Sequence, residues 1–160
     1  MIEYQQPVAS EYRPGVCNIG PAEIARRRRT GLVGLAVAIG LGTVLLASGA
    51  PARARLAVAA PTTVALSSFI QARCKFCAGY GLAGLQNMGR LGEEQRVEDA
   101  AARRADRVRA LRIHAVSFAG GLLVGIGFWR LRVKEPQPLL SLFRQAGAST
   151  GTYTPRYAFP

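Results

Sequence analysis

The segment TGLVGLAVAIGLGTVLLASGAPA (residues 30–52) holds 23 consecutive residues without a charged side chain, and Arg29 and Arg53 flank it. A helix that crosses the hydrocarbon core of a bilayer needs about 20 predominantly apolar residues, because each residue adds about 1.5 Å along the helix axis. The segment therefore predicts a transmembrane helix over residues 31–50 and places the chain among membrane proteins.

Two further segments have the composition of membrane spans. Residues 56–72 (LAVAAPTTVALSSFIQA) lie between Arg55 and Arg73 and contain Pro61 and four hydroxyl residues, which membrane helices tolerate. Residues 113–129 (IHAVSFAGGLLVGIGFW) end on Trp129, in the position of an interfacial aromatic residue. The sequence thus predicts an all-α fold, an integral membrane bundle of three transmembrane helices over residues 31–50, 56–72 and 113–129.

The remaining segments are assigned around these spans. Residues 1–20 are predicted to be a disordered N-terminal tail, residues 21–133 a transmembrane helical domain, and residues 134–160 a mostly irregular C-terminal tail. Residues 73–96 are rich in glycine and predict a loop. A long helix over residues 97–133 is predicted to begin as a cytoplasmic amphipathic helix leading into the third span. Its predicted amphipathic stripe consists of Val97, Ala101, Val108, Leu111 and Ala115.

The charge distribution predicts the orientation. The chain has 21 Lys and Arg residues against 9 Asp and Glu residues, and a net charge of +12. With the N-terminus in the cytoplasm, 14 of the 21 basic residues lie on the inner side and seven on the outer side, as the positive-inside rule favours. Most arginines lie close to an apolar segment, and aromatic residues are sparse among them, so nucleic-acid binding is not expected.

A cleaved signal peptide is the alternative interpretation of the first span. The basic run, the apolar run and Ala47-Ser48-Gly49-Ala50 resemble its three regions. Against it, about 30 residues precede the apolar run, and that run is longer than the usual 7–15 residues.

Small residues recur every four positions in the first and third spans. This spacing stacks them on one helix face, where they allow another helix to approach closely. The predicted packing residues are Gly34, Ala38, Gly42, Ser117, Gly121 and Gly125.

The chain has three cysteines and one histidine. Cys74 and Cys77 form a lone CxxC motif without the following histidine of a haem-attachment site. Cys17 and His114 are expected on the same side of the membrane, with His114 pointing into the bundle. Three thiolates and an imidazole would make a tetrahedral zinc site from Cys17, Cys74, Cys77 and His114. The alternative, that these are reduced thiols and a packing histidine without a cofactor, is preferred.

The segments CNIGPAEIARRRR (17–29), QARCKFCAGYGLAGLQNMG (71–89) and RVEDAAARRADRVRALRI (96–113) resemble small uncharacterised multi-pass membrane proteins of bacteria. The resemblance covers about residues 17–130 and carries no activity. It implies a location in the bacterial plasma (inner) membrane.

Three functions are compatible with these features. The first is a non-enzymatic accessory or structural subunit, whose partners would be the lipid bilayer and other membrane subunits or further copies of the chain. The second is a membrane-anchored metal or thiol site at the cytoplasmic face. The third is a small pore-former of the holin type. No predicted span contains Asp, Glu, Lys or Arg, which argues against a pump or carrier.

Overall fold

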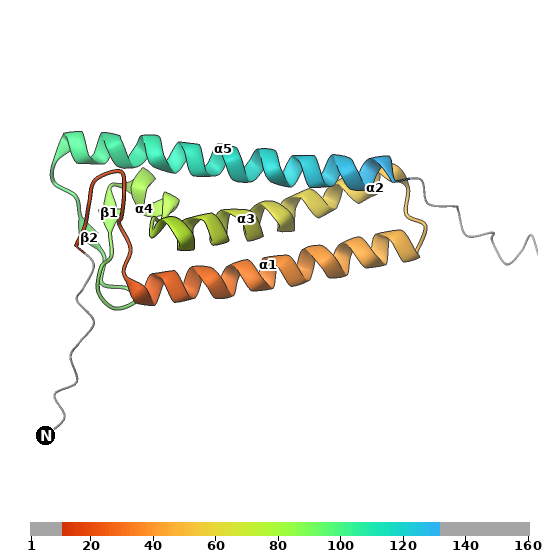
Figure 1. The fold of residues 1–160 in the computed structure, drawn as a ribbon, viewed down its shortest axis with the longest axis horizontal. Coiled ribbons are helices and arrows are strands. Elements are labelled where there is room, and N and C mark those ends of the chain that lie inside the picture. Colours follow the sequence, from red (N-terminus) through yellow and green to blue (C-terminus); the bar gives the residue numbers. More distant parts are fainter. Residues whose placement is uncertain (1–10, 132–160) are drawn as a thin grey trace, which may run out of the picture.

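In a computed structural model of the chain, residues 11–131 are described, and they are mostly helical (Figure 1). Residues 1–10 and the predicted tail at 134–160 lie outside the described residues. The elements in chain order are α1 (Pro21–Ala47), α2 (Ala52–Arg55), the 3-10 turn η1 (Leu56–Val58), α3 (Ala59–Cys74), α4 (Ala78–Ala83), β1 (Leu85–Gln86), β2 (Gln95–Arg96) and α5 (Ala100–Arg130).

The three longest helices lie side by side, with α3 between α1 and α5 (Figure 1). α1 has 27 residues and α5 has 31, and both are long and apolar enough to cross a membrane. The segment 56–72 falls in η1 and α3, which together with α2 form one helical run from Ala52 to Cys74. α3 itself has 16 residues, fewer than a full span usually needs, so the third span stays a prediction.

Small residues allow the three helices to approach closely. A Cβ atom added at Gly34 would lie 3.0 Å from the backbone nitrogen of Ala65 in α3. One added at Gly121 would meet Thr63 and would lie 2.8 Å from the carbonyl oxygen of Ala59. Helix backbones at these distances leave no room for a side chain. All six residues predicted as packing residues are buried: Gly34, Ala38, Gly42, Ser117, Gly121 and Gly125.

The outer surfaces of α1 and α5 carry large apolar side chains. Leu32 and Val33 of α1 are 60% and 64% exposed, and Val116, Phe118 and Leu123 of α5 are 62–70% exposed. A helix at the surface of a water-soluble protein turns such side chains inward and polar ones outward. Here the small residues face inward and the large apolar ones face outward.

The first part of α5 buries a different face from the predicted one. Asp99 caps the helix by accepting hydrogen bonds from the backbone N–H groups of Ala101 and Ala102, at 3.3 and 2.7 Å. The predicted amphipathic stripe is not the buried face of the helix, because Ala101, Val108, Leu111 and Ala115 are exposed there. Only Val97, which precedes the helix, is buried. The buried face consists of Ala102, Asp106, Ala110 and Ile113. Asp106 binds the N-terminal segment, while Ala110 and Ile113 pack with Phe76 and Ala78.

The N-terminal segment is folded from residue 11 onward, in contrast to the predicted tail. Arg13 pairs with Cys17 in an antiparallel bridge, and Ile19 pairs with Asn87 in a parallel bridge. Cys17, Asn18 and Ile19 are at most 7% exposed. The predicted loop at 73–96 is also partly ordered, because α4, β1 and β2 form there and cover the ends of α3 and α5 (Figure 1). Periodicity could not predict that Ile19 pairs with a residue 68 positions away.

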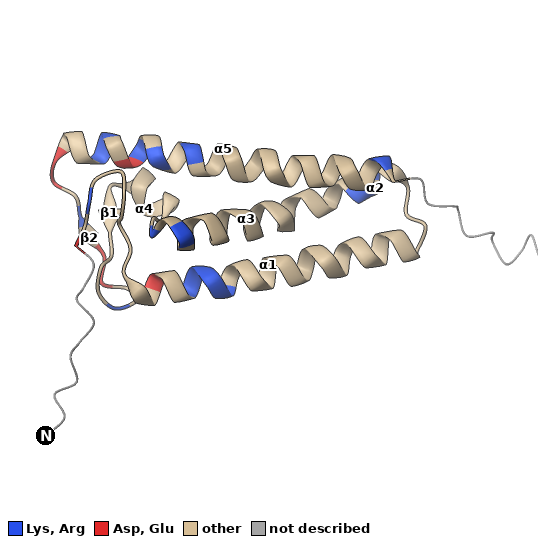
Figure 2. Ribbon diagram, viewed as in Figure 1, with Lys and Arg blue, Asp and Glu red and all other residues tan. Residues whose placement is uncertain are grey.

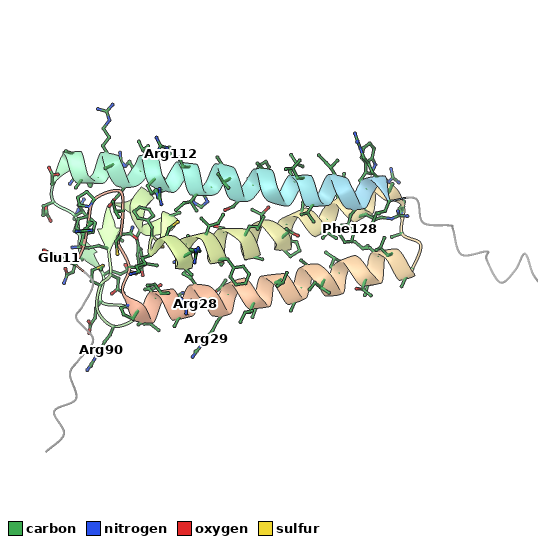
Figure 3. The ribbon with its side chains drawn as sticks, viewed as in Figure 1. Glu11, Arg28, Arg29, Arg90, Arg112 and Phe128 are labelled. Carbon is green, nitrogen blue, oxygen red and sulfur yellow. The ribbon has the colours of Figure 1, made fainter. Side chains whose placement is uncertain are left out.

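A buried arginine joins the helices at the other end of the bundle. The guanidinium of Arg55, which is 6% exposed, donates to the carbonyl oxygens of Ala50 and Leu131, at 2.9 and 2.7 Å. These bonds fasten the turn after α1 to the end of α5. Nearby, Phe128 of α5 reaches toward α1, where its ring occupies the space that a Cβ atom at Gly42 would need (Figure 3).

Candidate functional site

Most charged residues of the described part lie at one end of the bundle, around α4, β1 and β2 (Figure 2). We call this end the polar cap and define it as residues 11–20, residues 75–99 and the first turns of α1 and α5. It contains buried polar side chains from segments distant in the sequence. Among the described residues, the polar cap is therefore the candidate functional site.

Cys77 lies at the centre of the polar cap and is 1% exposed. It caps α4, and its Sγ accepts a hydrogen bond from the backbone N–H of Tyr80 at 3.4 Å. The guanidinium of Arg27, which α1 positions, donates to the same sulfur at 2.9 Å. A charged donor strengthens such a bond. This hydrogen bond joins α1 to α4. Because the sulfur is closed to solvent, Cys77 presents no accessible nucleophile.

Glu23 is a fully buried carboxylate one turn before Arg27. Its Oε1 accepts hydrogen bonds from the Tyr80 hydroxyl at 3.2 Å and from Arg26 at 3.4 Å. Its Oε2 lies 3.9 Å from Arg27 Nε, and neither of these two buried atoms has a hydrogen-bond partner. Burial of the ring, followed by the nearby carboxylates of Glu94 and Glu23, raises the pKa of Tyr80 to about 12. The hydrogen bond from the Tyr80 hydroxyl to this buried carboxylate joins the start of α1 to α4.

Amide side chains fix the backbone around the CxxC motif. Asn18 donates to the Cys77 carbonyl at 3.0 Å and accepts from the Cys77 N–H at 2.6 Å. Gln71 of α3 accepts from the Ala78 N–H at 3.0 Å. Both side chains are at most 5% exposed and satisfy backbone groups that would otherwise be buried without partners.

Asp106 is the second buried carboxylate of the polar cap. It accepts hydrogen bonds from the Tyr12 hydroxyl at 2.9 Å and from the Gly15 backbone N–H at 2.6 Å. Burial, and then the hydrogen bond to the Asp106 carboxylate, raise the pKa of Tyr12. The carboxylate thus holds residues 12–15 against α5.

The four predicted metal ligands do not come together. His114 is exposed, contrary to the expectation that it points into the bundle, because Ile113 and Ser117 occupy the buried face of α5. Cys77 faces Arg27 and Tyr80 inside the polar cap. Cys17 and Cys74 instead line a pocket of about 380 Å³ with Arg73 and Lys75. Within residues 11–131, no three His, Cys, Asp or Glu side chains are grouped closely enough to hold a metal ion.

Several residues of the polar cap escaped the sequence analysis. The sequence assigns no role in a site to Glu23, Asn18, Gln71, Asn87 or Asp106. Except for Gln71, they bind partners far away in the chain, such as Asn18 and Cys77, which are 59 positions apart. The one local indication is the small number of acidic residues, nine in 160. An acidic residue beside an apolar segment, such as Glu23, is therefore a candidate for a specific contact.

Comparison of the chain with protein-family models, with curated proteins and with solved structures finds no match in any of the three. Its function must therefore be argued from its own residues.

The three thiols are expected to react at different rates with a maleimide reagent in mild detergent. Cys74 is half-buried and should be modified first, whereas Cys17 and Cys77 are at most 7% exposed. Reaction at these two should be more than about tenfold slower, because it requires local opening of the polar cap, and such opening has its own free energy. Mass spectrometry of peptides from timed samples measures each site. Unfolding in strong detergent is the control and should equalise the rates, and rapid modification of Cys77 in the folded protein would contradict the arrangement described.

Proposed function

We propose that the chain is an integral membrane protein that crosses the bilayer three times and acts as a non-enzymatic accessory or structural subunit. The observation that carries the proposal is a zone without Asp, Glu, Lys or Arg, shared by three adjacent helices (Figure 2). The zone comprises residues 30–47 in α1, 56–72 in η1 and α3, and 113–129 in α5.

The three parts of this zone lie at the same level of the bundle. Gly34 packs against Ala65, Gly121 against Thr63, and Gly125 against Ala59, so the charge-free stretches face one another. A stretch of 17 helical residues spans about 25 Å, close to the ~30 Å hydrocarbon core of a bilayer. The exposed apolar side chains of α1 and α5 suit contact with lipid, and charged residues begin at both ends of the zone. These features together support three spans, including the central one.

The orientation that we propose places the polar cap in the cytoplasm. Among residues 11–131, 14 Lys and Arg residues lie on the cap side of the charge-free zone and three on the opposite side, and basic residues are retained on the cytoplasmic side. The location that we propose is the bacterial plasma (inner) membrane.

A structural role agrees with the use of the buried polar groups. Asn18, Gln71, Cys77 and Asp106 all hydrogen-bond to backbone groups or to side chains that fasten one element to another. The outward faces of α1 and α5 are apolar over much of their length, and offer surfaces for lipid and for helices of another subunit or a second copy.

The topology is tested with a reporter protein that is active only in the cytoplasm. Fusion after Gly92, in the polar cap, should give an active reporter, whereas fusion after Gly151 should give an inactive one, because three spans put the two sites on opposite sides. A second reporter that is active only outside the cytoplasm is the control and should show the reverse. Equal reporter activity at both sites would exclude three spans, and the inverted pattern would exclude the proposed orientation.

A further inference from the structure

A pocket of about 380 Å³ opens where α1 and α3 leave the charge-free zone. Its lining consists of Ile24, Arg28, Phe69, Ala72, Arg73 and Lys75. The three ionisable members are all cationic and the other three are apolar. A neighbouring pocket shares Arg73 and Lys75 but also contains Glu11, so the first pocket is the more favourable of the two for an anion.

The three cations of this pocket have no acidic partner within the described part of the chain. Arg26 and Arg27, on the same helix as Arg28, pair with Glu23, at 3.4 and 3.9 Å. No corresponding ion pair forms at Arg28, Arg73 or Lys75 among residues 11–131. Three cationic side chains around one cavity repel one another, and an anion between them would relieve that repulsion.

The backbone at Lys75 is a second, independent sign of a site. Lys75 ends α3 with φ 52°, and among residues 11–131 it is the only non-glycine residue with positive φ. Glycine would adopt this conformation without steric cost, and a non-glycine residue held there often marks a functional position. Its carbonyl accepts from the N–H groups of Asn18 and Ile19, at 3.1 and 3.3 Å, so the buried N-terminal segment holds the lysine at the mouth of the pocket.

We propose that this pocket binds the phosphate of an anionic phospholipid, with the acyl chains starting against Phe69. The inference rests on the proposed membrane location. Phosphate suits the three cations of the pocket, and Phe69 lies inside the charge-free zone at the level of Gly31, where the acyl region of a lipid would begin. Basic pockets between membrane helices on the cytoplasmic side bind anionic headgroups in this way.

The test uses the full-length protein, purified in mild detergent and titrated with phosphatidylglycerol, phosphatidylcholine or inorganic phosphate. Native mass spectrometry counts the bound molecules. The wild-type protein should retain one phosphatidylglycerol in preference to phosphatidylcholine. The variant Arg28→Gln/Arg73→Gln/Lys75→Gly should lose about tenfold or more of this affinity, as expected when several cation–phosphate contacts are removed together. Glycine is used at position 75 because it keeps the left-handed backbone.

The matched control removes three exposed arginines that do not line the pocket, as Arg29→Gln/Arg104→Gln/Arg107→Gln. Arg29 is adjacent to Arg28 but points away from the bundle (Figure 3). The control should keep its preference for phosphatidylglycerol, and Arg28→Lys/Arg73→Lys should also keep most of it because the charges remain. Equal loss in the control, or unchanged binding in the pocket variant, would overturn the proposal.

Two further outcomes are informative. One distinguishes a bound lipid from a free phosphate, and the other tests the membrane location of the protein. Inorganic phosphate that displaces phosphatidylglycerol at similar concentration would assign the pocket to a free phosphate and overturn the lipid assignment. Recovery of the wild-type protein in the soluble fraction after alkaline carbonate washing of membranes would overturn the proposed membrane location itself. Retention in the membrane together with loss of lipid selectivity in the pocket variant is the expected result.

Discussion

The substitution Gly121→Ile is expected to destabilise the bundle by about 3 kcal/mol, the upper part of the range for overpacking a close contact. A side chain at this position would meet Thr63 and the carbonyl oxygen of Ala59, 2.8 Å from the new Cβ atom. Rotation of Thr63 cannot relieve the clash with a backbone oxygen, so α5 must move away from α3. Loss of helicity on titration with a denaturing detergent measures the change.

Gly127→Ile is the matched control for this substitution. It places the same β-branched residue on the same helix, and a Cβ atom at Gly127 has no neighbour within 4 Å. Its effect should stay within about 0.5 kcal/mol, as for surface substitutions away from packed contacts. Equal stability of the two variants would show that the close contact between α3 and α5 is not formed in the folded protein.

The positions of the long helices could be predicted because they depend on local composition. The uncharged stretches between Arg29 and Arg53 and after Arg112 coincide with most of α1 and the second half of α5. Their ends are likewise local, since Pro21 occupies the first turn of α1 and Asp99 caps α5. The spacing of small residues by four is also a local feature, and the structure places those residues at buried positions.

The buried face of α5 could not be predicted by the same method. Counting apolar residues at helical spacing selected Val108 and Leu111, which are 44% and 60% exposed. That method assumes that the interior is more apolar than the surroundings. In the polar cap the interior is partly polar, with Asp106, Asn18 and Glu23 fully buried. The outward apolar residues are instead suited to the proposed membrane interface.

The four residues predicted as metal ligands do not come together, again because their directions depend on partners distant in the chain. Residue type and distance from the membrane grouped the three cysteines with His114, but neither property determines which way a side chain points. The direction of Cys77 follows from Asn18, which binds both of its backbone polar groups and lies 59 positions away. A step of one residue along α5, a rotation of about 100°, likewise separates buried Ile113 from exposed His114.

The substitution Asp106→Ala is expected to release the N-terminal segment from α5. The carboxylate is fully buried and accepts from Tyr12 and Gly15, more than 90 positions away in the sequence. Each hydrogen bond to a charged group contributes about 1.5–3 kcal/mol, so losing both should exceed the local stability of a short segment. Cys17, which is 7% exposed in the folded protein, should then react with maleimide at a rate close to that of Cys74.

Two variants show whether the carboxylate itself is responsible. Asp106→Asn retains an oxygen that can accept from the Gly15 N–H, and should raise the reactivity of Cys17 by less than Asp106→Ala does. Glu98→Ala removes the same charge from an exposed position nearby but keeps the Glu98 carbonyl oxygen that Arg103 binds, so Cys17 should stay protected. Unchanged protection of Cys17 in Asp106→Ala, with the helices still folded by circular dichroism, would mean that Ile19 and its pairing with Asn87 are enough to hold the segment, and that Asp106 is not its anchor.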